Sequence, residues 1–387
     1  MGQIKTIALY GGTGSIGSST LDLIAKFPDR YRLAVLTGGS NTETLAELAL
    51  HFKPDHVGLA DPNGYADLAE RLSGSGIAIS VGPDALNDLA TIPVDLVVSA
   101  VTGTAGLMPT LKAVEAGQTV AIANKESLVT AGAIIKQAAA ASGATILPID
   151  SEHNAIFQVW MADQADAIDH ITLTASGGPF WGMDAAAMVA ITPEQAVKHP
   201  NWSMGAKISV DSATMMNKGL EVIEAAVLFD LPEDRVRVLV HPQSIVHGMV
   251  HYRDGSVLAQ MGPADMRVPI SYAMAWPDRL SWPSEHLDLA ALADLSFQQP
   301  DDTRFPCLKL ARDASRHGGL ATTVLNAANE MAVDSFLHHR IGFLDIARLV
   351  QDMLETVSIE DHNSLEAIIE KDAETRQASR AWLAKQS

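Results

Sequence analysis

Two acidic residues stand one position apart at the end of an apolar segment. Residues 144–149 are apolar enough to form a buried strand, and Asp150 and Glu152 follow them directly. Side chains at positions i and i+2 can point to the same side, so both carboxylates can face one ligand. Hard oxygen donors of this kind suit Mg²⁺ or Mn²⁺, and Glu221 could supply a third. The pattern therefore predicts a divalent metal site, although a solvated acidic pair at a helix start would look the same.

Side chains that suit a phosphate monoester follow in three segments, 176–178, 199–205 and 211–218. They offer serine hydroxyls, an amide, an imidazole and an ammonium, a mixed donor set that can hold phosphate oxygens. Residues 177–205 are rich in glycine and proline and have little strand pattern, so we expect a lid that closes on a substrate. A surface loop around a core tryptophan is the alternative. His153, beside the acidic pair, is either a softer metal ligand or a packing residue.

A glycine-rich turn near the N-terminus predicts a dinucleotide site. Residues 4–10 have the pattern of a strand, and Gly12, Gly14 and Gly17 follow with the G-x-G-x-x-G spacing, at the start of a helix expected near Ser15. The first glycine allows a tight turn, the second lets a pyrophosphate approach the backbone, and the third lets helix pack on strand. Free N–H groups at the helix start would face the phosphates. A βα turn without a ligand is the alternative.

The next strand, 32–37, bears on the choice of cofactor. It leads into Gly38, Gly39, Ser40 and Asn41, where NAD-dependent enzymes usually place an acidic residue for the ribose hydroxyls. Small neutral groups tolerate a 2′-phosphate, so the pattern favours NADPH, although the segment has no Arg or Lys.

Two other classes of reductase are excluded. Short-chain dehydrogenases need a Tyr-x-x-x-Lys pair, and none of the 5 tyrosines has Lys four positions later. Phosphorylating semialdehyde dehydrogenases need a nucleophilic cysteine. The sole cysteine, Cys307, begins an apolar helix and is expected to be a buried structural thiol. One cysteine cannot form an intramolecular disulfide, which favours a reducing, cytoplasmic location.

The elements that position these residues change in character after residue 149. Up to there, continuous apolar strands alternate with helical segments, which predicts an α/β domain with a doubly wound parallel sheet. The expected strands are 4–10, 32–37, 55–60, 76–81, 94–101, 118–123 and 144–149.

Residues 150–275 predict an α+β domain, because strand patterns there are separated by less helix. The Asp254-Gly255 pair is a strong hairpin signal between the last two strands. Residues 276–305 are rich in Pro, Trp and Asp and are expected to form a linker, and residues 306–387 a helical domain. The strands expected in the α+β domain are 170–175, 206–210, 236–240, 246–252 and 256–261.

Length and charge limit the classes of partner. The 387 residues suggest two or three domains, and a net charge of −19 argues against nucleic-acid binding. No apolar stretch reaches the roughly 18 residues of a membrane span. The sequence runs almost directly from Met1 into the first apolar segment, so we expect no signal peptide. We therefore expect a soluble enzyme that acts on a small molecule.

Taken in order, these motifs resemble those of the 1-deoxy-D-xylulose 5-phosphate reductoisomerase family. The resemblance implies a Rossmann-like NADPH domain, a catalytic domain, a linker and a helical domain, assembled as a homodimer. The matching segments are 14–17, 123–127, 150–158, 176–178, 199–205, 211–221, 241–244 and 325–330.

The family's reaction rearranges 1-deoxy-D-xylulose 5-phosphate and reduces the product with NADPH to 2-C-methyl-D-erythritol 4-phosphate, on the methylerythritol phosphate route to isoprenoids. The resemblance implies metal ligands at Asp150, Glu152 and Glu221, with Lys125 completing the catalytic group. It implies substrate contacts at Lys125, Ser151, Glu152, Ser176, His199, Trp202, Ser212, Asn217, Lys218 and Glu221, with Trp202 and Met204 in the lid. Cofactor contacts are implied at Gly12, Thr13, Gly14, Ser15, Ile16, Gly38, Gly39, Asn41, Asn124, Glu126 and Gly205.

One departure and two alternatives remain at this stage. Family members often carry a basic residue near the 2′-phosphate, and its absence here predicts a weaker preference for NADPH. Another metal-assisted NADP oxidoreductase, such as a hydroxyacid or β-decarboxylating dehydrogenase, would share the glycines and carboxylates but have no use for the lid and phosphate motifs. A nucleotide-sensing protein without catalysis is the other alternative. The presence of Lys125 and the three carboxylates argues against it.

Overall fold

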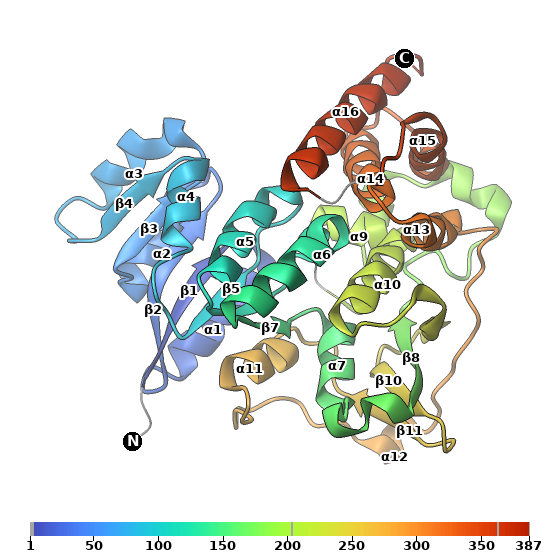
Figure 1. Cartoon of the computed structure of the whole chain (residues 1–387), viewed down its shortest axis with the longest axis horizontal. Helices are drawn as coiled ribbons and strands as arrows, with labels where there is room; N and C mark the ends of the chain where they lie inside the picture. Colours follow the sequence, from blue (N-terminus) through green and yellow to red (C-terminus); the bar gives the residue numbers. More distant parts are fainter. Residues whose placement is uncertain (1–3, 203, 362–363, 387) are drawn as a thin grey trace. The chain divides into compact units, whose positions relative to one another are not determined.

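The computed structural model describes residues 4–202, 204–361 and 364–386. The chain divides into two compact units. The first contains Met1–Ser127, Ile135–Ser151 and Met266–Pro283, and the second contains Leu128–Ile134, Glu152–Asp265 and Ser284–Ser387. Figure 1 colours the chain from blue at the N-terminus to red at the C-terminus.

The first unit is built on a seven-stranded sheet with the order β4-β3-β2-β1-β5-β6-β7. All neighbouring strands in it pair in parallel. The order reverses between β1 and β5, which makes the sheet doubly wound and confirms the α/β prediction. The strands are β1 Lys5–Tyr10, β2 Tyr31–Gly38, β3 His56–Leu59, β4 Ala78–Val81, β5 Leu96–Ser99, β6 Thr119–Ile122 and β7 Thr145–Pro148.

Helices connect these strands, as parallel pairing requires. One helix comes from much later in the chain: α11 belongs to the first unit, where Arg267 pairs with Asp22 of α1 at 3.0 Å. The helices of this unit are α1 Ser15–Lys26, α2 Thr42–Phe52, α3 Tyr65–Arg71, α4 Pro83–Leu89, α5 Leu107–Glu115 and α11 Arg267–Ala275, and α6 Lys125–Ser142 contributes both its ends.

The second unit contains a four-stranded sheet with the order β11-β10-β8-β9. β8 Ile168–Ala175 pairs in parallel with β9 Val236–Val240 and antiparallel with β10 Val246–Tyr252, which pairs antiparallel with β11 Val257–Met261. The mixed sheet confirms the expected α+β arrangement, with the predicted turn at Gly255, which has φ +90°.

One expected strand is wrong, because residues 206–210 lie in the helix α9 Ala206–Ala213. The alternation of polar and apolar side chains over these residues is too short to fix a strand. Helix-type contacts are formed instead: Lys207 pairs with Asp211 one turn later at 2.8 Å. Ser209 also donates a hydrogen bond to the Gly205 carbonyl at the start of the helix.

Most of the other helices of the second unit pack around a core that includes the buried face of its sheet, while α12 has no buried residue. Val238 of β9, Leu220 of α10 and Val324 of α14 lie in this core. From Pro306 onwards the described residues contain helices and no strand, as expected. The helices are α7 Ser151–Val159, α8 Pro193–Ala196, α10 Met216–Leu228, α12 Leu289–Leu292, α13 Pro306–His317, α14 Ala321–Leu337, α15 Phe343–Thr356 and α16 Leu365–Leu383. Among the helices that the structure describes, none combines the length and apolar character needed to span a bilayer.

Candidate active site

The glycine turn of the first unit has the geometry that a pyrophosphate requires. Gly12 donates its backbone N–H to the Thr37 carbonyl at 2.8 Å, which fixes the turn against β2. A Cβ atom on Gly17 would lie 2.6 Å from the Cα of Gly12, so only glycine lets α1 approach this closely. α1 begins at Ser15, as expected, and Gly14 gives it no side-chain cap. Its first N–H groups can therefore meet an anionic ligand.

The neutral segment after β2 is also placed beside a helix start. Asn41 caps α2 by accepting a hydrogen bond from the Thr44 N–H at 3.0 Å. Gly39 is exposed, and a Cβ atom there would meet nothing within 4 Å. The structure adds a cation that local sequence did not suggest: Arg71 of α3 lies 3.8 Å from Glu43 and 2.9 Å from Asp67. Two carboxylates thus already compensate its charge.

Asn124, predicted to bind cofactor, has its side chain engaged by the backbone. It caps α6 by accepting from the Ser127 N–H at 2.8 Å, and its amide donates to the carbonyl of Gly103, also at 2.8 Å, and to that of Val101. Glu126 in the same turn is buried. Asn124 therefore holds the loop after β5 against the start of α6.

Lys125 and Asp150 come together at the carboxyl edge of the sheet. Lys125 is the first residue of α6 after β6, and Asp150 follows β7, the neighbouring strand. Their side chains form an ion pair and are only 6% and 10% exposed. This is the edge at which open α/β sheets bind ligands. The predicted catalytic lysine and one predicted metal ligand are therefore neighbours.

In the second unit, Lys218 of α10 lies between two predicted ligands. Its ammonium is 2.7 Å from a carboxylate oxygen of Glu152 on α7, and it also pairs with Glu221 one turn further along α10. The Asn217 amide donates to Glu221. Burial alone would lower the pKa of Lys218, but the two carboxylates raise it by more, so the side chain stays charged.

The three predicted metal ligands form one group. One carboxylate oxygen from each of Asp150, Glu152 and Glu221 lies within 4.8 Å of the others. Asp150 immediately precedes α7 in the chain. Three clustered carboxylates are the hard donors that a magnesium-sized ion needs, with positions left for substrate oxygens. The residues present therefore fit a divalent metal ion.

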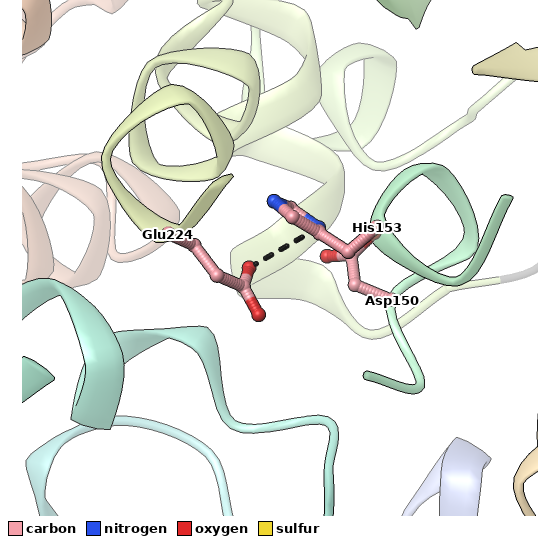
Figure 2. A group of neighbouring side chains, drawn as sticks. All are labelled: Asp150, His153 and Glu224. Atoms are coloured by element: carbon pink, nitrogen blue, oxygen red, sulfur yellow. Dashed lines mark ion pairs between the residues drawn. The ribbon is translucent and has the colours of Figure 1, made fainter. Parts of the chain in front are cut away.

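His153 lies behind these ligands, fully buried, and Figure 2 shows it facing Glu224. Its Nδ1 is 3.4 Å from a carboxylate oxygen of Glu224, and its Nε2 is 2.9 Å from the backbone carbonyl of Glu221. His153 thus supports the Glu221 backbone through Nε2, and ligand atoms of His153, Glu224 and Asp150 also lie within 4.8 Å of one another, a second group that could hold a metal ion. Sequence reasoning missed Glu224, although its position one turn after Glu221 on the same helix was an available signal.

Ser176 and His199 form the best-defined part of the predicted phosphate site. The His199 Nδ1 accepts the backbone N–H of Trp202 at 3.0 Å and that of Asn201 at 3.2 Å, so it carries no proton. Its Nε2–H therefore donates to the Ser176 hydroxyl oxygen, 2.8 Å away. Burial lowers the pKa of His199 to about 4, which keeps the ring neutral near pH 7. Ser176 also accepts from the Gly178 N–H, so its own hydrogen points elsewhere.

The remaining lid and phosphate residues are anchored nearby in the second unit. The Asn201 amide donates to the Pro242 carbonyl at 2.7 Å and to the Ser244 hydroxyl at 3.0 Å, which explains the motif at 241–244. Gly178 has φ +70°, and a Cβ atom there would lie 2.8 Å from the Ser212 carbonyl. Trp202 has its ring 5.9 Å from that of His247. Ser203 lies outside the described residues. Three further residues that were predicted to contact ligands lie at helix starts. Ser151 is the first residue of α7, Gly205 immediately precedes α9, and Asn217 is the second residue of α10.

The fold and these groups define a class: a dinucleotide-dependent oxidoreductase in which a glycine-turn domain is joined to carboxylates suited to a metal ion. Sequence comparison identifies the family within it. Models of 1-deoxy-D-xylulose 5-phosphate reductoisomerase match residues 7–132 and, for a C-terminal domain, residues 146–229. A DXP reductoisomerase C-terminal domain matches residues 261–378.

Relatives match over nearly the whole chain. The 1-deoxy-D-xylulose 5-phosphate reductoisomerase of Rhodospirillum centenum is 50% identical over 96% of this chain and 93% of its own length. That of Caulobacter vibrioides is 52% identical over 92% of this chain and 89% of its own length. The chain belongs to the 1-deoxy-D-xylulose 5-phosphate reductoisomerase family, which confirms the resemblance seen in the sequence.

Solved structures agree with this assignment. The Zymomonas mobilis enzyme in complex with NADPH superposes with a TM-score of 0.92 at 47% identity, covering 98% of this chain and 99% of that one. A DOX-P reductoisomerase in complex with NADPH, fosmidomycin and magnesium superposes with a TM-score of 0.95 at 44% identity, and the match covers 98% of each chain.

Proposed function

We propose that this protein catalyses the NADPH-dependent conversion of 1-deoxy-D-xylulose 5-phosphate to 2-C-methyl-D-erythritol 4-phosphate with a divalent metal ion, in isoprenoid precursor biosynthesis. The observation that carries the proposal is the match at 50% identity over 96% of the chain. The predicted carboxylates, lysines and phosphate-binding side chains are all present in that span.

Asp150, Glu152 and Glu221 are the proposed metal ligands, with Mg²⁺ or Mn²⁺ as the ion. The bound ion supplies a Lewis acid that polarises the substrate ketone and offsets the negative charge that develops on its oxygen. Lys218 now compensates two of these carboxylates. In the loaded enzyme we expect its ammonium to turn to the substrate phosphate, and we expect Lys125 and Ser151 to contact the oxygen-bearing carbons.

Ser176, His199, Ser212, Asn217 and Lys218 are proposed to hold the phosphate. The neutral His199 ring fixes the Ser176 oxygen by donating to it, so the Ser176 hydroxyl can donate its hydrogen to a phosphate oxygen. A phosphate held far from the reacting carbons supplies binding energy that orients them. The segment 177–205, with Trp202 and Met204, would close over the substrate and exclude water from the reactive aldehyde.

The cofactor is proposed to lie on the glycine turn, with its pyrophosphate at the start of α1. NADPH supplies the hydride for the reduction. The proposed contacts in the first unit are the ones predicted from the sequence, Gly12 to Ile16, Gly38, Gly39, Asn41, Asn124 and Glu126, and Gly205 in the second unit joins them. Near the proposed 2′-phosphate position, the described residues offer neutral groups and Arg71, which Glu43 and Asp67 already compensate. We therefore expect a weaker discrimination against NADH than a free cation would give.

We also propose that the enzyme is a cytoplasmic homodimer, as the family resemblance implies. Its single buried cysteine suits a reducing compartment. Among the described residues of the second unit, seven large apolar side chains are at least 38% exposed: Met161, Val189, Val257, Leu289, Leu295, Phe297 and Ile369. Exposed apolar groups of this kind favour burial against a partner. Light scattering on the purified protein would check this, since a monomer mass at micromolar concentration would contradict it.

The deciding experiment follows NADPH absorbance with 1-deoxy-D-xylulose 5-phosphate, in the presence of Mg²⁺ or Mn²⁺ and again with a chelator. Oxidation of NADPH that needs both the metal and this substrate supports the proposal. If a protein that demonstrably binds NADPH oxidises none, the substrate assignment is wrong. The remaining candidate is then another metal-assisted NADP oxidoreductase, to be tested with hydroxyacids.

A further inference from the structure

Two consecutive helices present the proposed phosphate ligands. Ser212 lies near the end of α9, and Asn217 and Lys218 lie in the first turn of α10. The connection is only two residues long, and Met215 adopts a left-handed conformation in it, with φ +64°. A non-glycine residue persists in this conformation only when its surroundings hold it there. The positions of these ligands therefore depend on what fixes the end of α9.

Asp211, immediately before Ser212, is the fixed point of that helix end. Its side chain is 1% exposed, and one carboxylate oxygen lies 2.8 Å from the Lys207 ammonium. The other oxygen accepts a hydrogen bond, also 2.8 Å long, from the side-chain amide of Asn329 on α14. A buried carboxylate is stable only when it is paired and hydrogen-bonded. Each of its oxygens has such a partner.

Asn329 reaches Asp211 from 118 positions away in the chain. It is fully buried, and its amide oxygen makes no hydrogen bond among the described residues. The hydrogen bond from the amide nitrogen to Asp211 is thus the polar contact that holds the Asn329 side chain in place. On the neighbouring side, α10 packs tightly on α13, because a Cβ atom on Gly219 would lie 2.5 Å from the Ala311 Cβ. The C-terminal helices thus back the phosphate-binding turn on both sides.

We propose that Asn329 is a positioning residue for the substrate phosphate, acting through Asp211 on Ser212 and the start of α10. The inference rests on the proposed function, which assigns Ser212 and Lys218 to the phosphate. Asn329 is proposed to act through Asp211 and not by touching substrate or cofactor itself. Its amide sets the orientation of the Asp211 carboxylate, and that carboxylate sets the end of α9.

The test compares Asn329→Asp with Asn326→Leu. The first substitution would place a second carboxylate against Asp211 and push the end of α9 away. Asn326 is a matched control: it is equally buried, lies one turn earlier on α14, and donates to Glu330 at 3.1 Å instead of to Asp211. For Asn329→Asp we expect a KM for 1-deoxy-D-xylulose 5-phosphate raised about tenfold, the size of a lost hydrogen bond to a charged group. The KM for NADPH should stay unchanged. Asn326→Leu should leave both values unchanged.

Two further measurements separate positioning from loss of stability. The double variant Asp211→Asn with Asn329→Asp exchanges donor and acceptor, so it should recover most of the lost KM. The activity of Asn329→Asp on phosphate-free 1-deoxy-D-xylulose should match that of the unaltered protein. An unchanged KM in Asn329→Asp, or an equal loss of activity on both substrates, would overturn this inference but leave the proposed function standing. Failure of the unaltered protein to turn over the phosphorylated substrate would overturn the proposed function and the inference with it.

Discussion

The charge at the carboxylate group depends on which cation compensates it. Lys218 pairs with Glu152 and Glu221, while Lys125 pairs with Asp150. The positive charge of an ammonium thus lies beside each of the three carboxylates that would bind a divalent ion. Because the pairs are buried, water screens this charge weakly. Changes to a single carboxylate should therefore act strongly on the metal and weakly elsewhere.

Glu152→Gln tests this at the metal. The amide is nearly isosteric but uncharged, so we expect turnover to fall about a thousandfold, the scale of losing a transition-state charge contact. The Kd for NADPH should change less than about twofold, because the glycine turn is a separate part of the chain. Steady-state kinetics and fluorescence titration measure the two quantities. Glu355→Gln on α15 is the control, since Glu355 is exposed and accepts a hydrogen bond from Gln351 on the same helix. An equal loss of turnover and of NADPH binding in Glu152→Gln would contradict the assignment of Glu152 as a metal ligand.

Ser176→Ala tests the phosphate site. Removing the hydroxyl takes away the proposed donor to a charged phosphate, so we expect the KM for the substrate to rise about tenfold. It also leaves the His199 Nε2–H without its acceptor, 2.8 Å away in the unaltered protein. Ser142→Ala is the matched control. Ser142 is the last residue of α6, in the first unit, and its hydroxyl donates to the Val114 carbonyl of α5. A KM equal to that of the control variant would show that Ser176 does not bind phosphate.

Sequence reasoning located these residues more readily than their partners. Asp150, Glu152 and Ser176 stand in motifs whose local pattern points to chemistry. The pairing of His153 with Glu224 depends on how α7 faces α10, and that of Asp211 with Asn329 on how α14 packs on α9. Both pairs join residues far apart in the chain, so no local pattern contains them.

At the scale of elements, two helix starts in the first unit differ in how they are secured. Asn41 caps α2 in the exposed segment after β2 with one hydrogen bond. Asn124, itself buried, caps α6 and also holds the buried carbonyl of Gly103 and the part-buried carbonyl of Val101. The second cap therefore ties the loop after β5 to the start of α6. Its loss removes a hydrogen bond from both carbonyls, although the Gly103 carbonyl keeps the one from the Gly106 N–H.

Asn124→Ala should lower the free energy of unfolding by about 2–3 kcal/mol, the sum of a lost cap and of the lost hydrogen bonds to the two carbonyls. Asn41→Ala should cost about 1 kcal/mol, because water can replace an exposed cap. Urea denaturation monitored by circular dichroism measures both. Similar values for the two variants would contradict a linking role for Asn124.

The element that was predicted wrongly shows the limit of short patterns. Over residues 206–210 the apolar alternation fits a strand, yet the Gly205 start and the Lys207–Asp211 pair belong to a helix. In the first unit, by contrast, each strand is a continuous apolar run followed by a helix. That combination fits little except a parallel sheet.

For the whole molecule, the order of motifs predicted the family and the two kinds of sheet, while the expected domain bounds stay a prediction. The strands of the first unit lie close to their expected ranges because most of them, unlike the edge strand β4, are largely buried and leave a strong apolar signal. The placement of α11 with the first unit had no such signal. It depends on contacts such as that of Lys5 with the Trp276 carbonyl, 271 positions apart.

Stability should fall in weak acid because buried histidines resist protonation. Burial lowers the pKa of His247 to about 4, against backbone hydrogen bonds that act the other way, and lowers those of His199 and His251 to about 4. The unfolded chain binds a proton at each near a pH of about 6.5, so between there and about pH 4 it holds more protons than the folded chain. The free energy of unfolding therefore rises with pH through this window. The stability that these histidines contribute is lost as the pH falls through it.

His247→Phe isolates the most buried of the three. The variant cannot take up that proton, so its unfolding free energy should depend less on pH, with a difference on the order of 3 kcal/mol accumulating between about pH 6.5 and about pH 4. Urea titrations at intervals down to about pH 4.5 measure the slope before most carboxylates protonate. Lys385→Gln, near the end of the chain and exposed, serves as control. Parallel curves for His247→Phe and the unaltered protein would mean that His247 is protonated as readily when folded as when unfolded.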